Sequence, residues 1–174
     1  PTEYEPHFRA QLLHTTVHDE GAAMLGGVSG HAGLFGNAND VAKLMQLYLN
    51  DGTYANKTYI AGNTVSEFGK CQFCDQGNYR ALGFDRPSKP GAQNSNAAPS
   101  APAESFGHSG FTGTYTWVDP VNKLVYVFLS NRVNPTRENP KLSKLNTRTN
   151  VLQVVYDAIE KSKTVKAEAS AVTK

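Results

Sequence analysis

The clearest hydrophobic pattern in the chain is helical and lies between residues 37 and 52. Apolar residues recur there three and four positions apart, at Val41, Leu44, Met45, Leu47, Tyr48 and Leu49. This spacing places them along one stripe of a helix. Asn37 or Asn39 can cap its start, and Gly52 follows its end. The pattern therefore predicts a helix whose wide apolar stripe packs on a core.

A second pattern predicts strands. Residues 111–118 and 124–130 are rich in Thr, Tyr, Trp, Val and Phe, and the turn-forming residues 119–123 separate them. This predicts an antiparallel hairpin with His108, Ser109 and Gly110 at the mouth of its first strand. A shorter hairpin is expected at residues 53–54 and 58–60 with Asn56 and Lys57 in the turn. A short helix at about 64–69 and a further strand within 79–87 follow.

The end of the chain returns to helical spacing. Its apolar positions are Val151, Leu152, Val154, Val155, Ala158 and Ile159. These predict a C-terminal helix that lies back on the sheet. Residues 161–174 carry no such stripe, so we expect a disordered tail. The predicted fold class is α+β, an antiparallel sheet flanked by helices, in one domain over residues 1–160.

Two segments predict loops. Residues 17–36 are dense in glycine, which indicates a turning, closely packed connection. Residues 87–105 consist mainly of Pro, Ser, Ala, Asn and Gly. Such a composition buries too little apolar surface to order itself, so a mobile surface loop is expected there.

Length and charge narrow the functional classes. A chain of 174 residues fits one domain. Its formal charge is +2, and its acidic and basic residues are interleaved, so no basic face is expected that could bind a phosphate backbone. Nucleic-acid binding is therefore not expected. No apolar run approaches the roughly 20 residues of a membrane helix, and the start lacks a signal-peptide profile. We expect a soluble protein, and a start at "PTEY" is compatible with a piece of a longer one.

The two cysteines, Cys71 and Cys74, leave several interpretations open. A zinc site needs two further ligands, and the five histidines show no paired spacing to supply them. A redox Cys-x-x-Cys motif is expected beside a βαβ pattern, which is missing here. The favoured interpretation is a buried thiol pair or a local disulfide on a loop. No metal and no cofactor are expected.

The candidate chemistry lies in "SFGHSGFTGTYTWVDP". A strand that starts from a turn of small residues exposes backbone N–H groups and a polar side chain at the rim of a cleft, where they can meet a substrate carbonyl. Gly110 allows close approach to the backbone. The structural alternative is that His108 is exposed or bonded to a backbone carbonyl on a glycine-rich strand end.

Two segments resemble a known family. "GHSGFTGTYTWVDP", with "KLVYVFLSNRVNPTREN" after it, and "VHDEGAAMLGGVSGHAGLFGNANDVAKLMQLYLNDGTY" resemble the C-terminal part of serine β-lactamase and penicillin-binding-protein-like hydrolases, on the class C and esterase side. The resemblance implies a partial β-lactamase/transpeptidase-like fold. It also implies that His108, Ser109 and Gly110 match the family's Lys-Thr-Gly or His-x-Gly triad. His108 would help to hold a substrate carboxylate or polarise the proton relay, and Phe111 would donate its backbone N–H to the oxyanion hole.

The family's other motifs are missing or misplaced. No Ser-x-x-Lys, the motif of the nucleophile, occurs in the chain. Tyr-x-Asn occurs at Tyr48 to Asn50 and at Tyr54 to Asn56, both outside the expected position. We therefore expect the C-terminal portion of such a hydrolase, inactive alone, with its nucleophile half N-terminal to Pro1. The face left by that half is a candidate for self-association. The alternative is a non-catalytic binding or structural module that keeps the cleft wall.

Other candidate residues carry weaker signals. Ser109 lacks the Gly-x-Ser-x-Gly context of a nucleophile, and the adjacent His108 would point to the opposite face of a strand. His31 either borders the cleft or bonds to backbone in its glycine loop. His18 and Asp19 form a local pair or a surface turn. The repeated glycines lack the Gly-Lys-Ser/Thr of a phosphate loop.

The resemblance also suggests substrates and a location. A β-lactam, a peptidoglycan peptide or a small ester is the expected small-molecule or peptide substrate of the parent protein. The N-terminal segment resembles versions that are often fused behind a family 3 glycoside hydrolase in Bacteroides-like bacteria. This context implies the bacterial cell envelope or periplasm.

Overall fold

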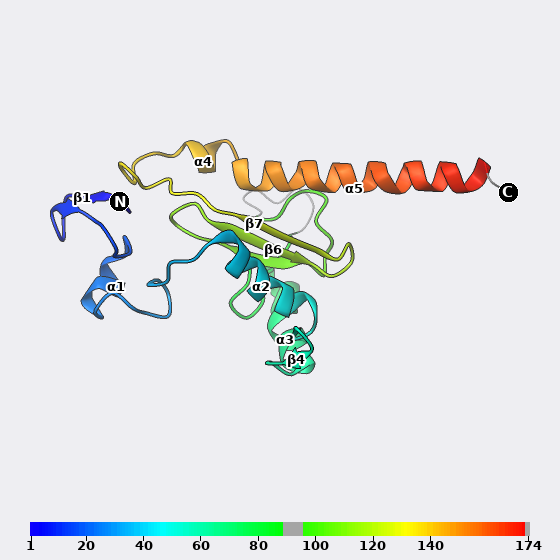
Figure 1. Ribbon diagram of the computed structural model, residues 1–174, viewed down its shortest axis with the longest axis horizontal. Coiled ribbons are helices and arrows are strands. Elements are labelled where there is room, and N and C mark those ends of the chain that lie inside the picture. The colour runs from blue at the N-terminus through cyan, green and yellow to red at the C-terminus, as the bar shows by residue number, and fades with distance from the viewer. Residues whose placement is uncertain (89–95, 173–174) are drawn as a thin grey trace.

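The computed structural model describes residues 1–88 and 96–172, and its centre has three layers (Figure 1). The middle layer is an antiparallel sheet of β5 (Phe106–Ser109), β6 (Tyr115–Asp119) and β7 (Leu124–Phe128) in that order. Helix α2 (Ala38–Leu49) lies on one face and α5 (Thr147–Val172) on the other. The predicted α+β class, with a sheet flanked by helices, is confirmed.

Residues of β6 are buried on both faces of the sheet, some against α5 and others against α2. Tyr115 and Trp117 are buried against Leu152 and Tyr156 of α5. Val118 is buried on the opposite face, in a cluster with Met45 of α2 and with Phe106. Alternate residues of a strand point to opposite faces, so this one strand anchors both helices.

The helix predicted from the first pattern is confirmed, including its cap. Asn37 accepts a hydrogen bond of 3.0 Å from the backbone N–H of Asp40. The hairpin that follows differs from the prediction: Lys57, expected in the turn, lies in a strand, and Tyr59 and Ile60, expected in a strand, do not. Its strands are β3 (Thr53–Tyr54) and β4 (Lys57–Thr58), because Ala55 and Asn56 both take positive φ angles in the turn. Helix α3 (Gly62–Gly69) agrees with the predicted helix and starts earlier.

The strand predicted within residues 79–87 does not form a regular ladder. Asp85 makes only an isolated bridge to Gly107, with backbone bonds of 2.7 and 3.0 Å. Gly83 precedes it in a left-handed conformation and Pro87 follows it without an N–H to donate. Both features stop the ladder.

Cys71 and Cys74 form a local disulfide, which agrees with one of the two favoured interpretations. A 3-10 turn, Cys74–Gln76, begins at the second of these cysteines.

Part of the predicted mobile surface loop is packed into the core, namely Ala97, Ala98 and Ser105. Ala97 and Ala98 are only 5% and 3% exposed and belong to the cluster beneath α5. The Tyr115 hydroxyl donates to the carbonyl of Asn96 over 2.7 Å. Small side chains fit closely where a low-complexity composition suggested no burial. Residues 89–95 of the predicted loop lie outside the described residues.

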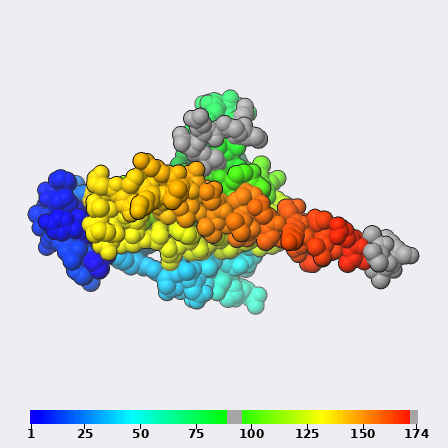
Figure 2. All heavy atoms as spheres, turned by 90° about the horizontal axis from the view of Figure 1, so that it is seen from above, coloured from blue at the N-terminus to red at the C-terminus, as the bar shows by residue number. Residues whose placement is uncertain are grey.

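Helix α5 extends further than the sequence suggested. Residues 161–172 continue it beyond the sheet, as Figures 1 and 2 show, where a disordered tail was expected. Lys, Ala and Glu, all good helix formers, are frequent there. Lys163 also bonds Glu160 and Asn122. Residues 173 and 174 lie outside the described part, and none of the described helices, α5 included, is long and apolar enough to cross a membrane.

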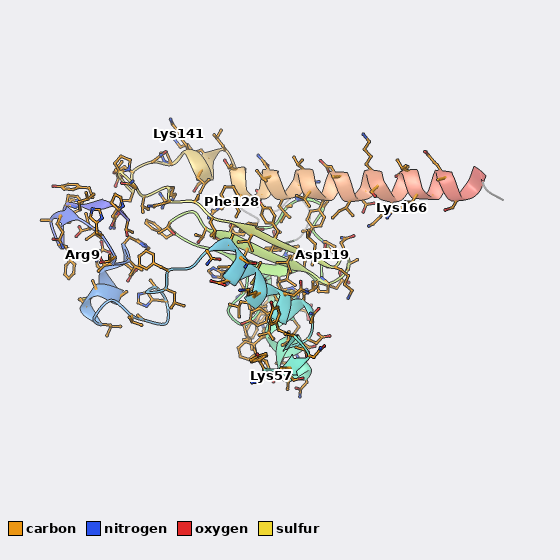
Figure 3. All side chains as sticks on the ribbon, viewed as in Figure 1. Arg9, Lys57, Asp119, Phe128, Lys141 and Lys166 are labelled. Atoms are coloured by element: carbon orange, nitrogen blue, oxygen red, sulfur yellow. A yellow bond between two sulfur atoms is a disulfide. The ribbon has the colours of Figure 1, made fainter. Side chains whose placement is uncertain are left out.

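The first 33 residues form an arm at one end of the molecule. It contains β1 (Tyr4–Glu5) paired with β2 (Gln11–Leu12), followed by α1 (Glu20–Met24). Glu3 is fully buried and its carboxylate pairs with Arg137 over 2.5 Å, just before α4 (Lys141–Lys144). Arg9, labelled in Figure 3, donates to the carbonyls of Val17 and His18 over 3.0 and 2.6 Å. These bonds fix the segment that carries His18.

Candidate active site

The His-Ser-Gly sequence ends a strand of its own, which corrects the prediction that it opens the strand at 111–118. His108 and Ser109 are the last residues of β5, and a tight turn over residues 110–114 leads into β6. The Gly110 N–H donates to the carbonyl of Thr114 over 2.8 Å, and the Gly113 N–H to Gly110 over 3.0 Å. Gly113 has a φ of 104°, and a Cβ there would lie 2.3 Å from Ser130 Oγ. The turn therefore requires glycine at this position.

His108 and Ser109 lie on opposite faces of β5, as the alternation of a strand requires. His108 is exposed, pairs in register with Thr116, and has its Nε2 3.4 Å from a guanidinium nitrogen of Arg80. Ser109 pairs with Tyr115 and borders a small hollow of about 250 Å³ beside Arg148. The two side chains are not brought together, which agrees with the argument against Ser109 as a nucleophile.

Two arginines hold the carbonyl groups of the turn. Arg148 donates to the carbonyls of Gly110 and Thr114 over 3.3 and 3.5 Å. Arg132 donates through Nε to the carbonyl of Phe111 over 2.7 Å. Hydrogen bonds from a charged donor are stronger than neutral ones. The side chains of Arg132 and Arg148 therefore fix the backbone orientation of the turn. This turn contains Phe111, whose N–H is the candidate oxyanion donor.

The Phe111 ring joins this turn to the N-terminal arm. It is 52% exposed and stacks on the His18 ring, with centroids 5.0 Å apart and planes 11° apart. The Arg132 guanidinium lies 4.3 Å from the centre of the same ring. Burial lowers the pKa of His18, while the carboxylates of Glu3 and Asp19 oppose that shift. A neutral His18 ring is thus favoured beside Phe111 and Arg132.

A large open hollow of about 1160 Å³ lies beside the turn. The turn and β6 line one side, and the glycine-rich loop and the start of α2 line the other. Leu34, Phe35 and Leu44 give this second side exposed apolar surface. Thr116 Oγ1 and Ser130 Oγ lie in the hollow's lining, buried and without a hydrogen-bond partner among the described residues.

His31 borders the hollow, but its bonds are not those expected. Its Nε2 lies 2.7 Å from Asp19 Oδ1 and its Nδ1 lies 2.9 Å from Ser29 Oγ. The interpretation of a histidine bonded to backbone is therefore wrong. Asp19 also caps α1 by accepting from the Ala22 N–H over 2.7 Å, and it pairs with His31 rather than with its neighbour His18. Sequence reasoning missed Ser29 altogether.

The two Tyr-x-Asn sequences serve the fold. Tyr48 packs against Phe84 with ring centroids 5.4 Å apart, and Asn50 follows the last residue of α2. Tyr54 lies in β3 and Asn56 in the hairpin turn. Within the described residues, no group of three His, Cys, Asp or Glu side chains could hold a metal ion.

Comparison with known proteins shows the family to which the chain belongs. The Beta-lactamase family model matches residues 2–149, and the chain belongs to that family. The resemblance to serine β-lactamases and penicillin-binding-protein-like hydrolases is thereby confirmed.

Individual relatives give the extent of the match. The chain is 38% identical over 139 residues to a "Putative D-alanyl-D-alanine carboxypeptidase" of Salmonella agona (strain SL483), and equally to one of Salmonella typhi. Each match covers 79% of this chain and 32% of the relative, so the chain spans about a third of these proteins' length. A solved structure described as a "putative beta-lactamase" from Bacteroides dorei DSM 17855 aligns with a TM-score of 0.42 and 17% identity. It covers 76% of this chain and 44% of its own.

Proposed function

We propose that this chain forms the strand-side wall of a serine hydrolase active site that acts through an acyl-serine intermediate. The candidate substrates are a peptide ending in D-alanyl-D-alanine, a β-lactam or a small ester. The observation that carries the proposal is the position of the His-Ser-Gly strand end. It leads directly into the turn of Phe111, at the edge of a hollow that the glycine-rich loop and α2 also line.

In this proposal each site residue has a distinct role. The Phe111 N–H donates to the oxyanion that forms when the substrate carbonyl is attacked. Gly110 lets the substrate approach the backbone. His108, with Arg80 beside it, binds the substrate carboxylate or polarises the proton relay. Ser109 is the middle residue of the motif and lies on the opposite face of the strand from His108.

The nucleophile of this reaction belongs to a Ser-x-x-Lys segment, which residues 1–174 do not contain. We therefore expect these residues alone to lack the activity that depends on the Ser-x-x-Lys serine. The curated relatives are about three times as long as the matched stretch. Parts of the parent protein beyond this stretch are thus the proposed source of the nucleophile and of the second oxyanion donor.

The test uses a longer form of the protein that includes a Ser-x-x-Lys segment. With a fluorescent penicillin we expect acylation of that serine, and we expect His108→Ala to slow it by about 100-fold, the scale of a positioned polar group in a transition state. His7→Ala is the matched control, since its side chain is exposed and lies outside both the His-Ser-Gly strand and the lining of the hollow. No acylation, or equal rates for both variants, would contradict the proposal.

The alternative is a binding or structural module that keeps the cleft wall without the reaction. The lack of a Ser-x-x-Lys sequence favours it. It predicts that the longest natural form of the protein also lacks Ser-x-x-Lys and binds a penicillin only reversibly. Intact mass after incubation with penicillin separates the two functions, because only the hydrolase gains a stable covalent adduct.

We also propose an envelope location for the parent protein. The Cys71–Cys74 disulfide supports it, since disulfides persist in oxidising compartments such as the periplasm. Fractionation of the native bacterium, with an antibody against this chain, is the corresponding measurement.

A further inference from the structure

Three side chains on the loop side of the large hollow form an acid, histidine and serine arrangement. Asp19 Oδ1 lies 2.7 Å from His31 Nε2, and His31 Nδ1 lies 2.9 Å from Ser29 Oγ. All three residues line the hollow. Both distances are within the range of good hydrogen bonds.

One tautomer of His31 satisfies both contacts. If Nε2 carries the proton, it donates to the Asp19 carboxylate, and the lone pair of Nδ1 accepts the Ser29 hydroxyl proton. These are the roles of acid, base and nucleophile in a serine triad, which is recognised by geometry and not by order in the sequence. The two ring nitrogens are exchanged relative to the common arrangement. We propose that Ser29 is a nucleophile activated by His31 and Asp19.

Two features around Asp19 support this assignment. The Ala22 N–H and the His31 ring both hydrogen-bond to the Asp19 carboxylate and lower its pKa, so the acid stays ionised and orients the ring. Gly21 provides the space for the pair. A Cβ at that position would lie 3.2 Å from Asp19 Oδ1 and 3.3 Å from His31 Nε2, closer than most real contacts.

The surroundings indicate the class of substrate. Ser29 is partly exposed, and the hollow that it borders carries the apolar side chains Leu34, Phe35 and Leu44. An uncharged ester with a short apolar acyl group fits this lining better than a charged peptide. The expected reaction is acyl transfer from an activated ester to Ser29.

Acylation of Ser29 needs no reactant besides the ester. Ser29 Oγ forms a bond to the carbonyl carbon, and the hydroxyl proton moves to His31 Nδ1. The bond from that carbon to the leaving alcohol's oxygen breaks, and the alcohol takes the proton from His31. Water hydrolyses the acyl-Ser29 ester through the same histidine. With a fluorophosphonate, Ser29 forms an O–P bond, fluoride leaves, and the proton passes through His31 to solvent.

This reaction does not depend on the proposed function. It uses only residues within 1–174, whereas the proposed function needs a Ser-x-x-Lys serine from elsewhere in the parent protein. Failure of either one leaves the other intact.

The experiment measures the rate of fluorophosphonate labelling of the full 174-residue chain by intact mass, with the modified serine mapped by peptide sequencing. We expect one adduct, on Ser29, that Ser29→Ala abolishes. His31→Ala should slow labelling by about 100-fold, the low end of general-base contributions. Gly21→Ala should slow it as well, because it crowds the Asp19–His31 contact.

Matched controls are Ser66→Ala and His7→Ala, which change exposed residues of the same types elsewhere in the molecule. Both should label at the parent rate. Circular dichroism checks that each variant is folded. If a variant is unfolded, hydrolysis of 4-nitrophenyl butyrate by the parent chain, lost in proportion to fluorophosphonate labelling of Ser29, supplies an independent readout. No adduct, an adduct on another serine, or a Ser29 adduct whose rate His31→Ala leaves unchanged would each overturn the proposal.

Discussion

At the scale of single residues, buried acids hold the N-terminal arm in place beside the site. Glu5 is fully buried and accepts the backbone N–H groups of His7, Phe8 and Arg9, the first two over 2.6 and 2.8 Å. These bonds lower its pKa from 4.5 to about 2. Together with the Glu3–Arg137 pair, they order the segment from which His18 reaches Phe111.

The first prediction concerns Glu5. Its pKa is lower in the folded state, so its stabilising contribution is complete above pH 4.5 and is lost as the pH falls towards about 2. We expect NMR titration of the Glu5 carboxyl to give a pKa near 2. In Glu5→Gln the amides of residues 7–9 should exchange faster at pH 7. A Glu5 carboxyl that titrates near 4.5 would show that these bonds do not form.

The second prediction concerns His18. Burial lowers its folded-state pKa below 6.5, so folding is favoured by the neutral ring. The contribution of His18 to stability is complete above pH 6.5 and is lost as the pH falls through 6.5 towards the folded-state pKa. NMR should show His18 titrating below the ordinary histidine pKa of 6.5, with Phe111 ring signals shifting in parallel. In His18→Phe the Phe111 signals should no longer depend on pH in this range.

The residues of the site were only partly predictable from the sequence. His108, Gly110 and Phe111 are adjacent in a recognisable motif, so they could be named, although their position at the end of β5 could not. Asp19 and His31 are 12 residues apart in a loop without a repeating pattern. Their contact depends on how the loop turns, which hydrophobic periodicity does not encode.

At the scale of secondary structure, both helices that flank the sheet follow from an apolar stripe. Leu152 is fully buried, whereas Val154, which the predicted stripe also included, is 66% exposed. The stripe and cap of α2 specified its bounds almost to the residue. The short strand β5 has no such signal, since two of its four residues are Gly and Ser, and it is ordered by pairing with β6.

The third prediction tests the α5 interface. Leu152→Ala should lower the free energy of unfolding by about 3 kcal/mol, since it leaves a cavity between α5 and the sheet. Val154→Ala is the matched control on the same helix and should change it by less than about 0.5 kcal/mol. Urea unfolding followed by Trp117 fluorescence measures both. Equal losses for the two variants would mean that α5 is not packed as described.

At the scale of the whole molecule, one group of exposed apolar side chains lines the large hollow. Leu34 is 89% exposed, Phe35 65% and Leu44 50%. Contiguous exposed apolar surface is typical of a face that another polypeptide covers.

The fourth prediction is that the isolated chain self-associates through this face. Sedimentation velocity over a concentration series should show the weight-average mass increasing with concentration. Leu34→Lys should shift the distribution towards the monomer, whereas Val165→Lys, which also replaces an exposed apolar residue but lies on α5, should not. A monomer at every concentration would exclude this association.

The free end of α5 has a practical consequence for handling the protein. Residues 161–172 add roughly 18 Å of helix beyond the layers, at 1.5 Å per residue. Figure 1 shows this end pointing away from the N-terminal arm. A biotin or a fluorophore attached near Lys166, labelled in Figure 3, would therefore sit on a rigid spacer. Immobilisation through this point would leave the hollow open to solvent for surface-based binding measurements.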